Sequence, residues 1–363
     1  MDRLRKNNND SRIDYGVNFT CFYIVFDWAP CFICGTDSGS EKSEWFFRGL
    51  AMQAVWYVVG ALAVVIIIHF DAKLLWRLTP FLYVIGLAVM LALLKYYDTA
   101  LFASTGSKNW FKFGTLTFQP SELMKIAYIL MMAMIITKHN VANKLRSLKT
   151  DTMLIGKMFL VTIPVLVLVL AQKDFGTMLV FLAIFAGMFL MSGISWLILV
   201  PTIILAIIVG GTLIFFVTTD TGREILSHIG FKNYQFARID SWLEPFHDPK
   251  GISFQLAHAL MAIGSGGMFG TGYNVSNVYV PVRESDMIFT VIGENFGFIG
   301  GAFVILIYFI LIYRMIRLCF DMNNEFYAYI ASGIVMMMLF HVFENIGANY
   351  RFVTINGNSV AVY

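Results

Sequence analysis

Apolar runs of close to 20 residues recur along most of this 363-residue chain. A helix of about 20 apolar residues is long enough to cross the hydrocarbon core of a bilayer, so the pattern predicts membrane-spanning helices. Charged residues make up 13% of the chain, about half of their share in a soluble domain. The strands of transmembrane β-barrels alternate polar and apolar residues, and these runs do not. We therefore expect an all-α, polytopic helical membrane protein.

We count nine apolar segments as candidate spans. The first is the weakest of them, because Asp27 and Pro30 interrupt it. No repeat or low-complexity linker divides the series, so we expect one transmembrane domain over residues 17–347, with a tail before it (1–16) and a polar tail after it (348–363). The nine segments are 17–35, 50–70, 78–94, 122–137, 158–171, 175–191, 196–217, 287–313 and 327–343.

Basic residues indicate how these segments are oriented. In membrane proteins Lys and Arg collect in short cytoplasmic loops. If all nine segments insert, the basic clusters fall on one side, which places the N-terminal tail in the cytoplasm and the stretches 98–118 and 218–285 outside, the latter as a large extracellular loop. The basic clusters are Arg3, Arg5, Lys6 and Arg12 in the tail, Lys138, Lys144, Arg146 and Lys149 after the fourth segment, and Arg314 and Arg317 after the eighth.

Charge and cysteine content exclude two classes of site. The formal net charge of +3 is too small to suggest binding to nucleic acid. Cys31 and Cys34 form a CxxC pair, but no second Cys or His pair completes a metal site. We therefore expect the four cysteines to be buried apolar residues.

Ionisable residues inside the spans are the first candidates for function, because each is costly unless it faces a partner or a wet cavity. Glu122 and Lys125 are three residues apart and share one helical face. They form either a structural ion pair or part of a polar cavity that opens outward and includes Asp174. His341 and Glu344 have the same spacing, and we interpret them as structural.

The outer loops hold the other candidates. Trp110 lies beside Lys108 and Lys112, as an interfacial anchor or as a platform for a lipid headgroup. Three ionisable groups (Arg283, Glu284, Asp286) crowd the outer end of the eighth segment. The glycine-rich stretch 264–272 predicts a tight turn or a re-entrant segment.

These residues lie in motifs that resemble those of the SEDS family of bacteria, which includes RodA, FtsW and SpoVE, and the RodA branch is the most similar. The resemblance extends from about Leu50 to Gly347. It rests on the motifs "GSKNWFKFGTLTFQPSELMK" (106–125), "AQKDFGT" (171–177), "EPFHDPKGISFQ" (244–255), "AIGSGGMFGTG" (262–272) and "RESDMIFTVIGENFGFIGG" (283–301).

The resemblance implies a ten-span fold and a peptidoglycan glycosyltransferase in the bacterial cytoplasmic membrane. Members polymerise lipid II at its outer face, for cell elongation and shape or for division, paired with a class B penicillin-binding protein. The resemblance further implies that Asp286 is the catalytic residue and that Trp110, the pair Glu122 and Lys125, and Asp174 occupy functional positions. Here the chain leaves the family pattern after "HVFENIG", and the tail 348–363 is not expected to span the membrane.

The implied chemistry is consistent with the residues on the outer side. A carboxylate is the available type of base for a sugar hydroxyl, and Asp286 supplies one. A lipid pyrophosphate leaving group brings negative charge, which basic groups or a divalent cation must offset. Suitable basic groups are Lys108, Lys112, Arg238 and Arg283.

Two other functions stay open at this stage. One is a lipid II flippase, although polar groups at midplane on broken helices would favour transport, and here they crowd the outer face. The other is an inactive scaffold that holds a penicillin-binding protein.

Overall fold

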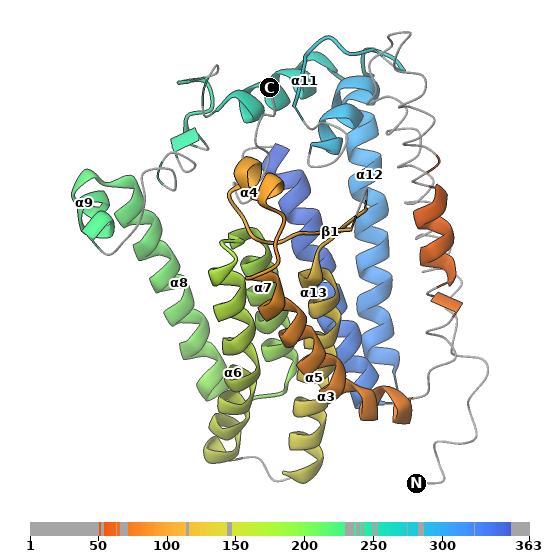
Figure 1. Cartoon of the computed structure of the whole chain (residues 1–363), viewed down its shortest axis with the longest axis vertical. Coiled ribbons are helices and arrows are strands. Elements are labelled where there is room, and N and C mark those ends of the chain that lie inside the picture. The colour runs from red at the N-terminus through yellow and green to blue at the C-terminus, as the bar shows by residue number, and fades with distance from the viewer. Residues whose placement is uncertain are drawn as a thin grey trace. The chain divides into compact units, whose positions relative to one another are not determined.

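The computed structural model describes most of residues 51–349 and divides them into two compact units (Figure 1). Unit 1 holds the described residues of Met1–Leu75 and His258–Asp321, and unit 2 those of Trp76–Ala257 and Met322–Tyr363. The gaps inside the described range are 52–53, 63, 66–71, 114–115, 144–146, 229–235, 237–239, 242, 249–250, 252, 274, 282–286 and 323.

Four helices form the core of unit 2, and the most buried of them is α5. Helix α13 packs against α5 and α7, and α5 also contacts α6 and α7. In the most apolar stretch of α5, 67% of the residues are buried. Glycines allow close approach, since a Cβ at Gly187 would overlap Met336 and one at Gly333 would overlap Ile129. The four helices are α5 (Pro120–Ala142), α6 (Leu148–Ala171), α7 (Phe175–Met191) and α13 (Glu325–Asn349).

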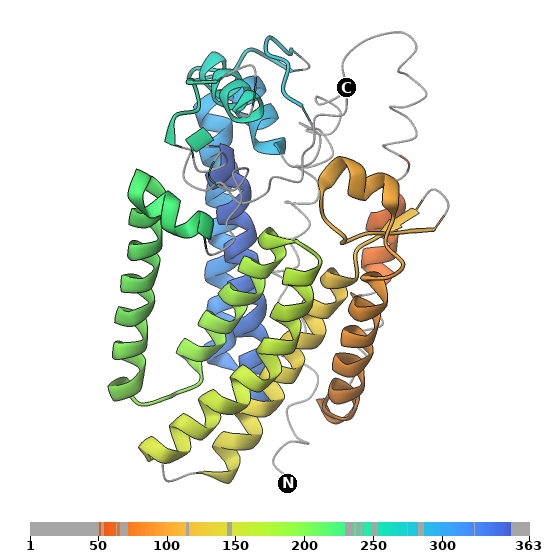
Figure 2. The same cartoon turned by 60° about the vertical axis from the view of Figure 1, so that its left-hand side comes forward.

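Helix α3 and a small surface substructure join this core. The hydroxyl of Tyr83 on α3 donates to the carbonyl of Val161 on α6, with an O···O distance of 2.6 Å. The short helix α4 and an antiparallel hairpin follow α3, and the view of Figure 2 shows both above the end of α3, in orange. The bounds are α3 (Ala72–Leu93), α4 (Thr99–Thr105), β1 (Phe111–Phe113) and β2 (Leu116–Phe118), with Phe111 opposite Phe118.

Helices α8 (Trp196–Thr218) and α9 (Asp220–His228) follow α7 in unit 2. Only 6% of the most apolar stretch of α8 is buried in the protein, and its main neighbour is α9. Figure 1 shows α8 standing apart from α5, α6 and α7. Because its side chains are apolar on all sides, the helix suits a lipid environment.

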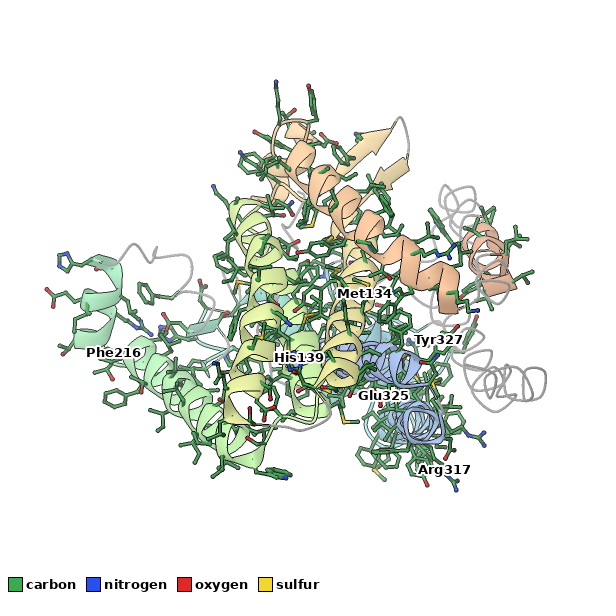
Figure 3. The ribbon with its side chains drawn as sticks, turned by 90° about the horizontal axis from the view of Figure 1, so that it is seen from below. Met134, His139, Phe216, Arg317, Glu325 and Tyr327 are labelled. Atoms are coloured by element: carbon green, nitrogen blue, oxygen red, sulfur yellow. The ribbon has the colours of Figure 1, made fainter. Side chains whose placement is uncertain are left out.

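Polar contacts collect where α5 ends and α6 begins. Seen from below (Figure 3), His139 of α5 lies beside α6, where Lys157 Nζ is 3.5 Å from its Nδ1. Ser147 caps α6 and exchanges hydrogen bonds with Thr150. The carboxylate of Asp151 accepts a hydrogen bond of 2.9 Å from the backbone N–H of Ser195, which begins α8.

Unit 1 is built around α12 (Ile288–Asp321) and the later part of α11 (Phe254–Ser265). The glycine-rich loop after α11 turns back onto α12. Gly297 has φ 65° and ψ −160°, so α12 is kinked after its first turns. A cluster of buried residues joins α11 to the stretch just before α12 and comprises Ala259, Ala262, Val280 and Met287.

The fold class expected from the sequence is confirmed: the chain is a multi-pass helical membrane protein. Six described helices are long and apolar enough to cross a membrane, and α7 is a shorter apolar helix. The count of nine spans stays a prediction, because segment 17–35 and part of segment 50–70 lie outside the described residues. Two stretches expected as outer loops contain regular secondary structure. Residues 98–118 contain α4 and the hairpin, and residues 218–285 contain α9 and α11.

Candidate functional site

Six of the nine residues proposed from the sequence lie in unit 2, around the N-terminal ends of α5 and α7. They are Lys108, Trp110, Lys112, Glu122, Lys125 and Asp174. The other three are Arg238, Arg283 and Asp286, and they lie outside the described residues.

Asp174 connects the loop before β1 to the start of α7. It caps α7, because its carboxylate accepts from the N–H of Thr177 at 3.1 Å and from the Thr177 hydroxyl at 2.9 Å. Asn109 Nδ2 donates to the same carboxylate at 2.8 Å, and Gln119 Nε2 donates at 3.3 Å. Asp174 is 4% exposed. A buried carboxylate needs such donors, so these four hydrogen bonds hold the charge in place.

The segment that carries Trp110 is held by its backbone. Trp110 is half-buried, and its carbonyl accepts from the N–H of Asp98 at 3.1 Å. Asp98 caps α4 by accepting from the N–H of Ala100 at 2.9 Å. The other Oδ of Asp98 lies 3.7 Å from Nζ of Lys112. Trp110 and Lys112 therefore sit on a segment that is fixed to the start of α4.

Helix α6 ends in a Schellman motif that places Lys173 next to Lys108. The N–H of Asp174 donates to the carbonyl of Val169, and the N–H of Lys173 donates to that of Leu170. Lys173 has φ 61°, in the left-handed region where glycine is usual. A side chain at such a position costs about 1–2 kcal/mol. The N–H of Lys108 donates to the carbonyl of the preceding Gln172 at 2.8 Å.

Glu122 and Lys125 form an ion pair, one of the two alternatives that the sequence left open, and the pair extends to α13. The Nζ of Lys125 lies 2.8 Å from the carboxylate of Glu122 and 3.0 Å from Nε2 of His341. His341 in turn lies 3.8 Å from the carboxylate of Glu344. Lys125 is 2% exposed, whereas the side chain of Glu122 is 56% exposed. The structure thus brings Lys125 together with His341, while Asp174 contacts a different set of side chains.

In unit 1, Glu294 fixes the loop that precedes the segment of Asp286. Its Oε1 accepts from the N–H of Asn277 at 2.6 Å and from that of Val278 at 3.1 Å. Its backbone carbonyl accepts from both the N–H and the hydroxyl of Thr271. Glu294 is 1% exposed. This buried carboxylate therefore ties the loop over 271–278 to α12.

Sequence reasoning missed several of these residues. Asn109, Gln119, Lys173 and Glu294 all lie inside motifs that were recognised, but no pattern in the sequence indicated their partners. His341 was interpreted as structural, and its contact with Lys125 joins α13 to α5. In the described part of the chain, no three His, Cys, Asp or Glu side chains are grouped as a metal ion would require.

Comparison with known proteins gives matches along most of the chain. Residues 31–360 match the family described as cell cycle proteins, FtsW/RodA/SpoVE. FtsW of Neisseria gonorrhoeae (strain NCCP11945), named a probable peptidoglycan glycosyltransferase, is 30% identical over 348 residues, which cover 86% of this chain and 71% of that protein. MrdB of Escherichia coli (strain K12), named a peptidoglycan glycosyltransferase, is 29% identical and covers 80% of this chain and 73% of its own length. Stage V sporulation protein E of Bacillus subtilis (strain 168) is 29% identical, and the match covers 69% of this chain and 64% of that protein.

Solved structures share the fold. One chain from the work "Structural coordination of polymerization and crosslinking by a peptidoglycan synthase complex" superposes with a TM-score of 0.71 at 24% identity, covering 95% of this chain and 89% of that chain. The rod shape determining protein RodA of Thermus thermophilus superposes with a TM-score of 0.60 at 22% identity, covering 96% of this chain and 91% of that chain. At these identities the likeness concerns the fold alone.

Proposed function

This chain belongs to the FtsW/RodA/SpoVE family of cell cycle proteins, as its motifs predicted, and on that premise we propose that it is a peptidoglycan glycosyltransferase. The proposed reaction polymerises lipid II into glycan strands at the outer face of the bacterial cytoplasmic membrane. The observation that carries this proposal is the match over residues 31–360, together with the names of the relatives, two of which are given as peptidoglycan glycosyltransferases, one of them as probable.

The position of the polar groups supports chemistry at the membrane surface. Asp174 is the cap of α7, and Glu122 is in the first turn of α5. Trp110, Lys108 and Lys112 lie in the segment that precedes α5. A transporter is expected to place such groups at midplane on discontinuous helices. Groups at helix ends suit a reaction on a lipid headgroup.

We propose Asp286 as the general base for the attacking sugar hydroxyl. Asp286 lies two residues before the first helical residue of α12, Ile288. A carboxylate near a helix start is stabilised as the anion, which lowers its basicity, so exclusion of water by bound substrate has to raise it again. The chain upstream is anchored, since Glu294 holds the backbone at 277 and 278.

The proposed leaving group is a lipid pyrophosphate, whose charge needs cations as the bond to the sugar breaks. We propose Lys108, Lys112, Arg238 and Arg283 for this role, with Trp110, Glu122, Lys125 and Asp174 as further substrate-binding residues. A class B penicillin-binding protein is the proposed partner. One chain of a peptidoglycan synthase complex shares the fold of this chain, which supports that choice.

The test is a polymerisation assay with purified full-length protein, its penicillin-binding protein partner and fluorescent lipid II. We expect a ladder of glycan strands on a gel. Movement of lipid II between leaflets without a ladder would identify a flippase instead. The absence of both activities would favour a role as a scaffold.

A further inference from the structure

Two lysines from distant parts of unit 2 converge on one aromatic ring. The Nζ of Lys108 lies 4.6 Å from the centre of the Tyr97 ring and 5.6 Å from that of Phe102. The Nζ of Lys173 also lies 5.6 Å from the centre of the Phe102 ring. The two rings pack edge to face, with 5.2 Å between their centres. Each ammonium group is attracted to an aromatic face, so both charges lie beside the same pair of rings.

The backbone fixes this arrangement. The N–H of Lys108 donates to the carbonyl of Gln172, the residue just before Lys173, and Gln172 is fully buried. Lys173 occupies the left-handed position that ends α6 and thereby turns the chain toward α7. The convergence therefore does not depend on two flexible side chains meeting by chance.

The neighbouring carboxylates already have other partners. Asp174 accepts hydrogen bonds from Asn109, Gln119 and Thr177. Asp98 caps α4 and lies near Lys112. Within the described ranges, no carboxylate forms an ion pair with Lys108 or Lys173. Two positive charges beside the same pair of rings repel each other, and a bound anion lowers this cost.

We infer that Lys108 and Lys173 form a binding site for the phosphate group of a lipid headgroup. The site lies just beyond the ends of α3 and α6, which are both of membrane length, so it belongs at the level of lipid headgroups. Half-buried aromatic residues such as Tyr97 and Phe102 are typical of that depth. Basic pockets between membrane helices bind anionic headgroups by the same chemistry.

Two kinds of lipid carry this chemistry: a phospholipid with a phosphodiester and a polyprenyl lipid with a pyrophosphate. Both are used as probes, with the full-length protein in micelles of dodecyl maltoside, a detergent that carries no phosphate group. The measurement is the affinity for phosphatidylglycerol and for undecaprenyl pyrophosphate by native mass spectrometry. It needs no turnover, so its outcome is separate from that of the polymerisation assay.

The informative variants are Lys108→Gln, Lys173→Gly and the two combined. Each single substitution is expected to weaken binding about fivefold, since a basic residue at the membrane surface contributes on that scale, and the combined variant about twenty-five-fold. Glycine suits the left-handed position, so Lys173→Gly is expected to keep or raise the melting temperature, which separates lost binding from misfolding. Lys95→Gln is the matched control, because Lys95 is exposed and lies 5.6 Å from the centre of a different ring, that of Tyr96.

A loss of affinity for undecaprenyl pyrophosphate alone assigns the site to the glycosyl donor, and a loss for phosphatidylglycerol alone assigns it to a structural lipid. Both results support the site. Wild-type affinity of the combined variant for both probes overturns it, because Lys173 then only complements the dipole of α6. An equal loss in Lys95→Gln also overturns it, because the effect is then one of general surface charge.

Discussion

Asp174 accepts four hydrogen bonds while almost fully buried, so the packing at the start of α7 depends on these bonds. In Asp174→Asn the single oxygen still caps α7, but the amide nitrogen that replaces Oδ2 can accept from neither Asn109 nor Gln119. We expect this change to lower the free energy of unfolding by about 1–3 kcal/mol, the cost of buried polar groups without partners. The measurement is the melting temperature of the purified protein in detergent.

The control for this prediction is Glu224→Gln, which changes an exposed carboxylate on α9 in the same way. Its melting temperature is expected to stay at the wild-type value, because exposed charges contribute little. Equal melting temperatures for Asp174→Asn and wild type would contradict the role of Asp174 as the junction between the loop and α7.

Asp286 is proposed to serve chemistry and not folding. A carboxylate near a helix start contributes at most about 1 kcal/mol to stability through capping and dipole effects. Loss of a general base instead lowers the rate by roughly a hundredfold or more. Asp286→Asn is therefore expected to abolish glycan ladders while expression and partner binding stay near wild type.

Glu284→Gln is the neighbouring control for Asp286, and we expect it to be milder because the family resemblance gives Glu284 no catalytic role. Ladders of normal length and rate from the Asp286→Asn protein would remove Asp286 as the base. That result would reopen the flippase as an explanation.

Ionisable residues of the candidate site could be found from the sequence, but the side chains that they contact could not. Asp174, Glu122 and Lys125 stand out as ionisable groups near apolar runs. Asn109, by contrast, is 65 positions from Asp174, and His341 is 216 positions from Lys125. Such pairs exist only once the helices are packed. The conformation of Lys173 was equally hidden, because nothing in its residue type predicts a positive φ.

At the scale of elements, the kink in α12 is where the glycine-rich loop meets the helix. The N–H of Phe298 donates to the carbonyl of Gly267, and that of Gly272 donates to the carbonyl of Asn295. A Cβ at Gly297 would overlap the backbone of Met268 and Gly270. The loop and the helix can only approach this closely because both lack side chains at the contact.

Gly297→Ala is expected to destabilise unit 1. The residue has φ 65°, and the added methyl group would meet rigid backbone, so the expected loss is about 1–3 kcal/mol. Gly264→Ala is the matched control, since it lies inside α11 with nothing within 4 Å of the added Cβ. Alanine favours helices over glycine by up to about 1 kcal/mol, so this control is expected to be neutral or stabilising. A lower melting temperature for Gly264→Ala than for Gly297→Ala would contradict the assignment.

Long helices were predicted well, and short elements were not. The segment predicted as 175–191 coincides with α7 (Phe175–Met191), because an acidic cap precedes it and a turn containing Gly193 follows. The segments predicted as 122–137 and 158–171 are parts of the longer α5 and α6. Charged and polar residues extend those helices beyond the apolar stretch. The segment between α4 and the hairpin contacts Gln172 and Asp174, and local sequence does not indicate such distant partners.

At the scale of the whole molecule, lipid takes the place of a large protein core. Helix α5 is well buried, while α8 is exposed along nearly its whole length. In a soluble protein the face of α8 would be an aggregation hazard, but in a bilayer it is solvated by acyl chains. Hydropathy therefore identified the six described helices of membrane length, whereas the helices that pack around α5 could be named only from the structure.

Orientation is the property of the whole molecule on which the proposed function depends most directly. The positive-inside rule places the turn between α5 and α6 in the cytoplasm, because Lys138 and Lys149 flank it. The hairpin at the other end of α5 then faces outward, together with Trp110 and Asp174. The exposed residues Thr117 and Thr152 report on these two ends.

In a variant whose four native cysteines are replaced, Thr117→Cys is expected to react with a membrane-impermeant maleimide in spheroplasts, whose cytoplasmic membrane is intact. Thr152→Cys is expected to react only after the membrane is permeabilised. The cysteine-free parent gives the background. The reverse pattern would place Lys108, Trp110 and Asp174 in the cytoplasm. Polymerisation of lipid II at the outer face would then be impossible for this site, whatever the family of the chain.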